Sequence, residues 1–406
     1  MQSLSLTLWA VVVMVVLNVM LVALTIGVKF MRSVRERRTK SRLQRLESAL
    51  DGSLATGEIH PYLQRLDDRD TDLLAILMID YLSVLRGAER ERLATLAEES
   101  GLVRKYFSRL RAHNRWRKAR AAENLGYFGG PGAVGPLTEL LSHPDETVRA
   151  VAGRALARIG TPDAAGALAK TLNDPSELTR MRMAENLERI GPLATEPLVE
   201  ALETGDPRAQ VLAARILGNL RAAKAGPSLC QTMLGDSLTD VRAQAALALG
   251  RIGNPEDVPS LQEAAGDEDW PVRAQVANAL GMIGDLSTVP TLQKLSVDRE
   301  WWVRLNASRS LANIGPAGER ALAEVLEGDD HFARDRAAAT LEERGIVRRA
   351  VEELQAPGEK GAGARAMISA MVRAGAVRYL ERLARTMPDE DVRAALTRTM
   401  EEARDA

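Results

Sequence analysis

The sequence predicts an all-α protein, a right-handed α-solenoid of helical hairpins with a period of about 31 residues, behind one N-terminal transmembrane helix. Three observations carry this prediction. A glycine, a leucine and a small residue recur every 30 to 32 residues through most of the 406-residue chain, residues 4–28 carry no charge, and only 3% of the residues are aromatic. A repeat of this length indicates stacked hairpins, an architecture that points to binding before chemistry.

Each repeat has the pattern of two helices joined by short turns. In residues 241–253, Val241, Ala245, Leu249 and Ile252 follow helical spacing, and Gly253 ends the helix. A shorter second helix carries its own leucine. Neither helix can bury its apolar side alone, so neighbouring hairpins must stack. The repeat ends are marked by Gly129, Gly160, Gly191, Gly253, Gly284, Gly315, Gly345 and Gly375, with Arg221 in the one place that lacks a glycine.

The order of these patterns predicts how the chain is divided. We expect a transmembrane anchor (1–30), a basic juxtamembrane segment (31–45), a helical N-terminal cap (46–115), the repeat solenoid (116–355), a linker (356–365) and C-terminal capping helices (366–406). The linker is predicted from the glycine-rich run GEKGAGAR at residues 358–365, which follows Pro357.

The apolar run predicts a membrane location. Residues 4–28 would extend about 37 Å as a helix, enough to cross a hydrocarbon core of about 30 Å. Basic side chains follow the run directly, and the positive-inside rule places them in the cytoplasm. We therefore expect a single-pass protein of the inner membrane that contacts the lipid bilayer through residues 4–28, with its N-terminus outside and its solenoid in the cytoplasm. The single cysteine, Cys230, suits a reducing compartment.

Three short motifs support a family resemblance. They are Asp240-Val241-Arg242, Trp270-Pro271-Val272-Arg273 and Trp302-Val303-Arg304, each followed by the small residue, the leucine and the glycine of the repeat. With these motifs, residues 115–345 resemble HEAT repeats, and more narrowly the HEAT-like repeats named after the phycobilisome lyases, in a bacterial membrane-anchored HEAT-repeat protein. The resemblance implies the fold but little about function, because unrelated activities occur on such solenoids.

An arginine column lies eleven residues before the repeat ends. One interpretation is a stripe that binds anions. The other, which we favour because the column repeats with the fold, is a ladder in which each arginine meets helix-end carbonyls and a carboxylate such as Asp145, Asp240, Asp269 or Asp330. The column consists of Arg149, Arg180, Arg242, Arg273, Arg304 and Arg334.

Two basic segments are candidates for binding lipid or another anion. One follows the apolar run. The other, residues 102–120, contains eight basic and no acidic residues, interleaved with aromatic ones. The alternative for the second segment is a solvated helix face answered by nearby glutamates. The candidate residues are Arg32, Arg35, Arg37, Arg38, Arg104, Lys105, Arg109 and Arg111.

Two sets of residues are candidates for binding a protein partner. Trp270, Trp301 and Trp302 concentrate three of the five tryptophans in adjacent repeats, where they either form a hot spot or pack over the neighbouring hairpin. A mostly polar column lies two residues after the leucine of each second helix, which we expect to line the concave face. It consists of Glu139, Lys170, Glu200, Gln231, Glu263, Lys294 and Glu324.

No pattern of residues indicates catalysis. The four histidines are scattered, and no zinc-protease, C-x-x-C, nucleophile-elbow or P-loop motif occurs. We therefore expect no enzyme activity, cofactor, metal or small-molecule substrate. Residues 29–45 carry a net charge of +7, so the remainder carries −8 within the total of −1, which argues against nucleic-acid binding.

The sequence-based hypothesis is a membrane-anchored cytoplasmic scaffold or adaptor that binds a protein partner. We expect that partner to belong to a membrane complex, for example a glycosyltransferase or polysaccharide-synthesis enzyme. One alternative is a regulatory subunit whose basic cap binds anionic lipid or a phosphorylated ligand. Another is an unrecognised enzyme such as a bilin-lyase-like protein, an activity that the family resemblance implies and from whose pattern the predicted anchor departs.

Overall fold

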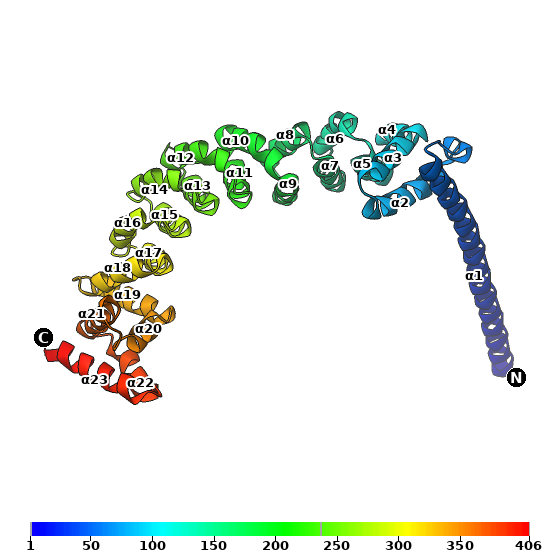
Figure 1. Cartoon of the computed structure of the whole chain (residues 1–406). Helices are drawn as coiled ribbons and strands as arrows, with labels where there is room; N and C mark the ends of the chain where they lie inside the picture. Colours follow the sequence, from blue (N-terminus) through cyan, green and yellow to red (C-terminus); the bar gives the residue numbers. More distant parts are fainter. Residues whose placement is uncertain (1, 236–237, 406) are drawn as a thin grey trace. The chain divides into compact units, whose positions relative to one another are not determined.

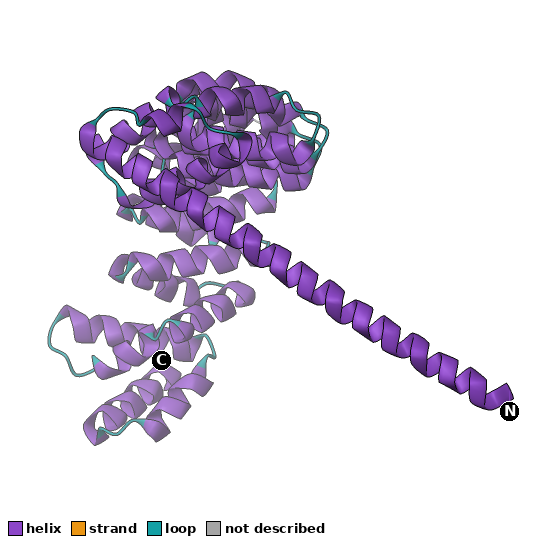
Figure 2. Cartoon of the chain, turned by 90° about the vertical axis from the view of Figure 1, so that its right-hand side faces the viewer, coloured by secondary structure: helices purple, strands orange, loops and turns teal. Residues whose placement is uncertain are grey.

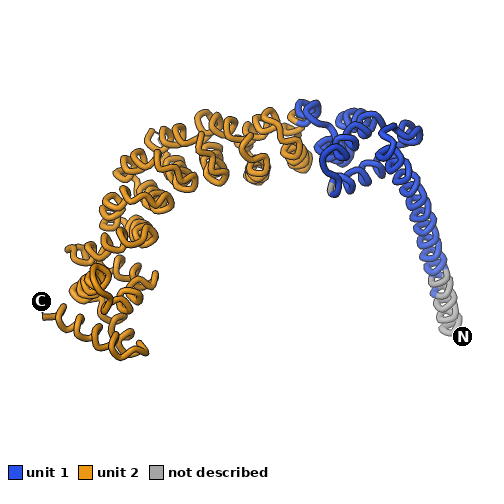
Figure 3. The backbone as a smooth tube through the Cα atoms, in the orientation of Figure 1, with its two compact units in different colours: residues 1–137 blue, residues 138–406 orange. Residues whose placement is uncertain are grey.

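The computed structural model describes residues 2–235 and 238–405, without the side chains of residues 2–13, 15, 16, 18, 19 and 83. These residues form helices joined by turns, with no strand among them (Figure 2). The chain divides into two compact units, Met1–Leu137 and Thr138–Ala406 (Figure 3). The predicted all-α solenoid of hairpins is confirmed.

Unit 1 begins with α1 (Gln2–Thr56), a helix that continues without a break into the basic segment. Its C-terminal part packs on the helices that follow, where Leu46 and Leu50 are fully buried beside Leu74 and Leu93. Arg42 of α1 also forms ion pairs with Asp67 and Asp70, at 2.8 and 2.9 Å. The other elements are η1 (Pro61–Gln64), α2 (Asp68–Val84), α3 (Gly87–Glu99), α4 (Leu102–Leu110), α5 (Arg115–Phe128) and η2 (Pro131–Ala133), and α6 (Val134–Glu139) continues across the boundary between the units.

The predicted membrane span is corrected by the structure. Over the residues that the structure describes, no helix combines the length and apolar character needed to cross a bilayer. Part of the predicted span, residues 4–13, 15, 16, 18 and 19, lies outside the described side chains. This finding contradicts the predicted localisation as a single-pass protein of the inner membrane, and the structure gives no support for the predicted lipid contact.

Unit 2 stacks helical hairpins in two rows (Figure 1). The inner row, on the inner side of the bend that these hairpins make, consists of α7 (Glu146–Ile159), α9 (Glu177–Ile190), α11 (Pro207–Asn219), α13 (Thr239–Ile252), α15 (Trp270–Ile283) and α17 (Trp301–Ile314). The outer row consists of α8 (Pro162–Lys170), α10 (Thr195–Thr204), α12 (Gly226–Gly235), α14 (Val258–Ala264), α16 (Val289–Leu295) and α18 (Pro316–Leu326).

Short 3-10 helices and a helical C-terminal segment complete unit 2. The 3-10 helices are η3 (Leu140–Ser142), η4 (Thr171–Asn173), η5 (Gly191–Ala194), η6 (Ala223–Ala225), η7 (Pro255–Asp257) and η8 (Leu286–Thr288). The C-terminal helices are α19 (His331–Glu343), α20 (Ile346–Glu352), α21 (Glu359–Arg373), α22 (Val377–Thr386) and α23 (Glu390–Asp405).

Small residues set the close spacing of the inner row. A Cβ atom on Gly250 of α13 would lie 2.5 Å from the Cα of Ala279 in α15. A Cβ on Gly281 of α15 would lie 2.2 Å from Oγ of Ser310 in α17, whose hydroxyl donates to the carbonyl of Ala277 at 2.8 Å. Because glycine lets two backbones approach, the helices of the inner row pack closely, and this row lies on the inner side of the bend (Figure 1).

The two leucine columns form the core between the rows. Each leucine is fully buried, as the periodicity predicts. The inner-row column in unit 2 is Leu156, Leu187, Leu217, Leu249, Leu280 and Leu311, and the outer-row column is Leu168, Leu198, Leu229, Leu261, Leu292 and Leu322.

The predicted repeat-end residues have positive φ, except Gly129, whose φ is −77°. Gly253 ends α13 with φ 76°, in the left-handed region that glycine adopts without a steric penalty. At the place where the repeat lacks a glycine, Arg221 takes φ 50° and is the one described non-glycine residue with positive φ. The repeat geometry therefore persists even where the sequence does not favour it.

The predicted linker at 356–365 is wrong, because α21 is helical from Glu359 onward. Gly361 is buried and approaches the carbonyl oxygen of Ala356 so closely that a Cβ would lie 2.0 Å from it. Arg365 donates to the carbonyl of Leu354 at 3.0 Å. Here the glycines permit close packing and do not mark a flexible break.

Candidate functional site

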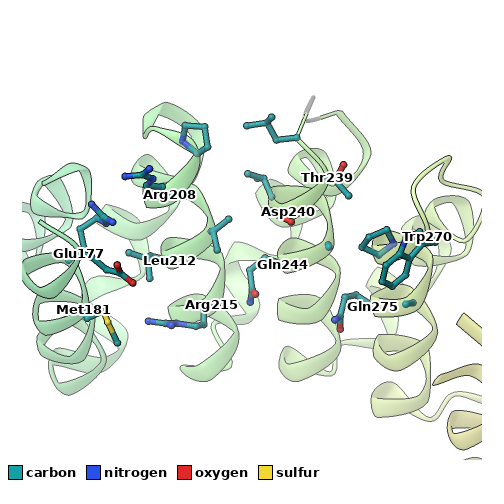
Figure 4. Close-up of a pocket in the computed structure, with 18 of the residues that line it drawn as sticks. Glu177, Met181, Arg208, Leu212, Arg215, Thr239, Asp240, Gln244, Trp270 and Gln275 are labelled. Atoms are coloured by element: carbon teal, nitrogen blue, oxygen red, sulfur yellow. The ribbon is translucent and has the colours of Figure 1, made fainter. Parts of the chain in front are cut away.

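A groove of about 1410 Å³ runs over the inner row, across α9, α11, α13, α15 and α17 (Figure 4). Its edge follows the points where these helices begin, and its floor follows their second and third turns. Helix starts are fixed by side chains such as Asp206, which accepts from the backbone N–H of Ala209 at 2.8 Å. Because the helices start in register, residues at equivalent repeat positions form rows along the groove.

Apolar and cationic side chains form the end of the groove between α9 and α11. Met181 of α9 faces Leu212 and Arg215 of α11, and all three line the cavity (Figure 4). Arg215 is half-buried and forms no ion pair with any residue that the structure describes. Arg208, exposed at the groove edge, likewise has no ion pair within that part of the chain.

Side-chain amides line the middle of the groove. Gln244 of α13, Gln275 of α15 and Asn306 of α17 occupy the same position in successive repeats. Nδ2 of Asn306 donates to the carbonyl of Ala274 at 3.2 Å. Nε2 of Gln244 and Oε1 of Gln275 are shielded from solvent and have no hydrogen-bond partner among the described atoms.

Tryptophans line the far end of the groove. Trp270 and Trp302 both border the cavity and remain 40% and 53% exposed. Trp301 is 47% exposed and does not border the cavity, and its ring meets Trp302 edge to face with centroids 4.6 Å apart. Trp270 and Trp302 therefore line the groove, and Trp301 packs against the ring of Trp302.

The comparison with known families decides what kind of repeat this is. The family model described as HEAT repeats matches residues 103–188, 195–274 and 261–342, more than half of the chain. The chain belongs to the HEAT-repeat family. No curated protein matches the sequence.

Solved structures with similar HEAT-type stacks are diverse. YibA of Escherichia coli is 21% identical, with 58% of this chain and 91% of that chain covered and a TM-score of 0.37. The complex of CpcE and CpcF of phycocyanin lyase from Nostoc sp. PCC7120 is 22% identical, with 60% and 94% covered and a TM-score of 0.33. Kap121p bound to Nup53p is 13% identical, with 84% and 45% covered and a TM-score of 0.46. At these identities and TM-scores, their names say nothing about the partners or chemistry of the present chain.

The arginine column forms a structural ladder between HEAT repeats, as we favoured. Nε and Nη2 of Arg273 donate to the carboxylate of Asp298 in the next inter-repeat turn, at 2.8 and 2.9 Å. Nη1 donates to the carbonyls of Asp267 and Glu268 in the preceding turn, at 2.9 and 3.0 Å. Arg242 bonds Asp267 in the same bidentate way. Arg273 thus bonds both the inter-repeat turn before its helix and the turn after it.

The predicted carboxylate partners are mostly corrected. Of the four predicted aspartates, Asp269 forms an ion pair with Arg242, at 3.0 Å. Asp145 and Asp330 cap α7 and α19. For Arg149, Arg242 and Arg273 the carboxylate lies 25 residues after the arginine, at Asp174, Asp267 and Asp298, because that spacing reaches the next turn.

Some steps of the ladder lack a carboxylate. Arg304 of α17 donates to the carbonyls of Asp298 and Arg299 and forms no ion pair among the described residues. The step at Arg180, beneath the groove, is of the same kind. Arg180 of α9 donates to the carbonyls of Asp174 and Pro175. The residue 25 positions later is Gly205, and no ion pair of Arg180 occurs among the described residues. In α11 the arginine is replaced by Gln210, which donates to the carbonyl of Leu202 at 2.9 Å. The step between α9 and α11 is therefore held without the bidentate pair found further along.

Asp298 is expected to make the HEAT solenoid sensitive to acid. Burial raises the pKa of Asp298, but hydrogen bonds from Arg273 and from the backbone N–H of Glu300 outweigh burial and hold the pKa below its ordinary value. A carboxyl with a depressed folded-state pKa stabilises the fold above its unfolded pKa of about 3.9, and this contribution is lost as pH falls through the folded-state pKa. Thermal denaturation between about pH 6 and pH 2 should show a smaller acid-induced loss in Asp298→Asn than in the parent chain. Equal losses would contradict this role.

The polar column predicted for the concave face lies elsewhere. Its seven residues are exposed, but none of them lines the groove. From Lys170 to Glu324 they lie on outer-row helices. The prediction failed because it assigned the concave side to the second helix of each hairpin, whereas the small residues that allow close approach are on the first. The column of Glu139, Lys170, Glu200, Gln231, Glu263, Lys294 and Glu324 is therefore a solvated outer surface.

The basic candidates in unit 1 differ in how far they are free to bind an anion. Arg109 forms ion pairs with Asp68 and Asp72 at 2.9 and 2.6 Å. Lys105 donates to the carbonyl of Leu66 and to the hydroxyl of Thr71. These internal bonds favour the interpretation of a helix face answered by carboxylates, although the carboxylates are aspartates of α2 and not the expected glutamates. Residues that remain exposed are Arg32, Arg35, Arg37, Arg38, Arg104 and Arg111, of which Arg32 pairs with Glu36 at 3.1 Å.

Sequence reasoning missed the amides, the cationic end and the apolar end of the groove. A signal was present for the amides, because Gln244 and Gln275 are 31 residues apart and Asn306 follows at the same interval. Met181, Leu212 and Arg215 belong to repeats whose sequences differ at these positions, so no period reveals them. Within the described residues, no group of three or more His, Cys, Asp or Glu side chains is placed to hold a metal ion.

Proposed function

We propose that this HEAT-repeat chain is a non-catalytic, protein-binding scaffold whose partner occupies the groove over the inner row. The observation that carries the proposal is the pair of half-exposed tryptophans, Trp270 and Trp302, at one end of a groove that spans five helices. Exposed aromatic anchors beside a cavity are where binding energy concentrates in protein interfaces. The narrower hypothesis of a membrane-embedded partner depended on the predicted span and is dropped with it.

The composition of the groove supports a protein partner over a small molecule. Small-molecule sites are enclosed and mostly apolar, with few polar groups. This groove is open and long, and it alternates apolar, amide and charged side chains across successive repeats. Such a surface offers many weak contacts, which a polypeptide can satisfy at several points along its length.

Trp270→Ala combined with Trp302→Ala is expected to weaken partner binding at least tenfold, since hot-spot tryptophans each contribute about 2 kcal/mol or more. A photo-crosslinking amino acid at Leu212 identifies the partner in the groove, and the same amino acid at Gln231 on the outer row is its control. Affinity for the captured partner is then measured with the double variant and with Trp116→Ala, which removes a tryptophan that is 64% exposed in unit 1. Capture from Gln231 but not from Leu212, or equal affinity of the double variant and the parent chain, would rule the proposal out.

A further inference from the structure

The amide groups in the groove lack the partners that a buried polar group requires. Nε2 of Gln244 is an unpaired donor and Oε1 of Gln275 is an unpaired acceptor, both shielded from solvent. Leaving such groups unpaired costs free energy that a ligand with matching groups recovers. The terminal torsion of glutamine is broad, so either amide can turn toward the groove at little cost. The pair is therefore suited to a ligand that carries both a donor and an acceptor.

An extended polypeptide carries those two groups at every residue. Adjacent packed helices lie about 8–10 Å apart, so the amides of Gln244 and Gln275 repeat at about that interval along the groove. In the extended polyproline II conformation three residues make one turn of about 9 Å, so every third peptide group returns to the same side of the chain. One peptide group in every three thus meets an amide, and Asn306 continues the series on α17. A helical ligand does not fit this pattern, because its backbone groups are bonded within the helix.

The charged side chains that line the groove indicate which kind of polypeptide can bind there. Glu177 and Asp240 lie in the first turns of α9 and α13, at the edge of the groove. Arg215 lies in the third turn of α11, half-buried on the floor beside Met181 and Leu212 (Figure 4). Because its guanidinium has no ion pair within the described residues, a carboxylate that enters along the floor gains a charge-assisted hydrogen bond.

We propose that the groove binds an extended, acidic segment of the partner protein. A carboxylate of the segment pairs with Arg215, its backbone bonds the amides of Gln244 and Gln275, and a large apolar side chain packs against Trp270. Arg215 and Trp270 are two helix steps apart, about 16–20 Å across the row, and the offset from the third turn to the first adds about 12 Å along the helix axes. The carboxylate and the apolar side chain are therefore about six or seven residues apart in the segment. This inference rests on the proposed function and adds the chemistry of the partner.

The test uses two fluorescent peptides of about twelve residues and the full chain. Both are built of serine and glycine, with a leucine about six residues after a pair of charged residues. One peptide carries two glutamates and the other carries two lysines. Fluorescence anisotropy should show at least tenfold tighter binding of the glutamate peptide, and Arg215→Met should remove that preference. Equal binding of the two peptides, or tighter binding of the lysine peptide, would overturn the inference.

A second pair of variants isolates the amides. Gln244→Met with Gln275→Met keeps the side-chain size and removes both amides, and it should weaken the glutamate peptide about tenfold, since each lost hydrogen bond contributes several-fold. Gln231→Met with Gln293→Met makes the same change on the outer row and should leave binding unchanged. Unchanged binding in the first variant would overturn the backbone role. Crosslinking of a partner from Leu212 without binding of either peptide would refute the extended acidic segment while leaving the scaffold proposal intact.

Discussion

Arg273→Ala is expected to lower the free energy of unfolding of the solenoid by about 3 kcal/mol, as the removal of one member of a buried ion pair does in other proteins. The side chains of Arg273 and Asp298 are only 8% and 12% exposed, so the substitution leaves Asp298 as a buried charge without its bidentate partner. It also removes the donor to two carbonyls of the preceding turn. Urea denaturation followed by tryptophan fluorescence measures the loss locally, because Trp270, Trp301 and Trp302 lie in the two helices that this arginine joins.

The matched control is Arg309→Ala. Arg309 pairs with Glu343 at 4.0 Å, with both side chains 50% exposed. Exposed pairs of this kind contribute from zero to about 1 kcal/mol, so the control should be nearly as stable as the parent chain. If Arg273→Ala and Arg309→Ala shifted the urea midpoint equally, the ladder would not hold the repeats together.

Gly250→Ala is expected to destabilise the solenoid by about 1–3 kcal/mol, the usual cost of overpacking. The added methyl group would lie 2.5 Å from the Cα of Ala279, so α13 and α15 must move apart. A backbone atom cannot turn aside as a flexible side chain can. The result is opposite in sign to what helix propensity alone predicts, since alanine is better than glycine by about 0.5–1 kcal/mol within a helix.

Gly166→Ala separates the two effects. Gly166 lies within α8 of the outer row, and nothing lies within 4 Å of the position of its Cβ. Helix propensity should therefore dominate there, and the variant should gain about 0.5–1 kcal/mol. Thermal or urea denaturation measures the change in the free energy of unfolding of both variants relative to the parent chain. A gain in both would show that the inner row accommodates a wider spacing than its glycines suggest.

The repeat itself was predictable because its signals are local. A leucine that recurs every 31 residues is expected to be buried, and a glycine that recurs after four helical turns favours a helix end there, so the columns of Leu249 and Gly253 were assigned correctly. The arginine ladder was also predictable as structure, since a column that recurs with the fold serves the fold. Its partners were not, because the choice between Asp267 and Asp269 depends on how far one turn lies from the next.

The binding surface could not be predicted to the same extent. It depends on whether the first or the second helix of each hairpin lies on the inner side of the bend. That choice is decided by contacts between different repeats, such as Gly281 against Ser310, and these are not visible in the pattern of one repeat. The tryptophans were recognised from their rarity, which is a compositional signal. Arg215 and Met181 were not, because ordinary residues become distinctive only when the fold places them beside a cavity.

The missing carboxylate between α9 and α11 has a mechanical consequence. In a solenoid each repeat contacts only its neighbours. When the solenoid is bent, the change in geometry is therefore largest at the contacts between repeats that are held least firmly. The pair of Arg273 with Asp298 stiffens its own joint, whereas Arg180 has Gly205 at the equivalent place. We therefore expect bending of the stack to change the gap that holds Met181 and Arg215 more than the width of the tryptophan end, which lies over the joint held by Arg273 and Asp298.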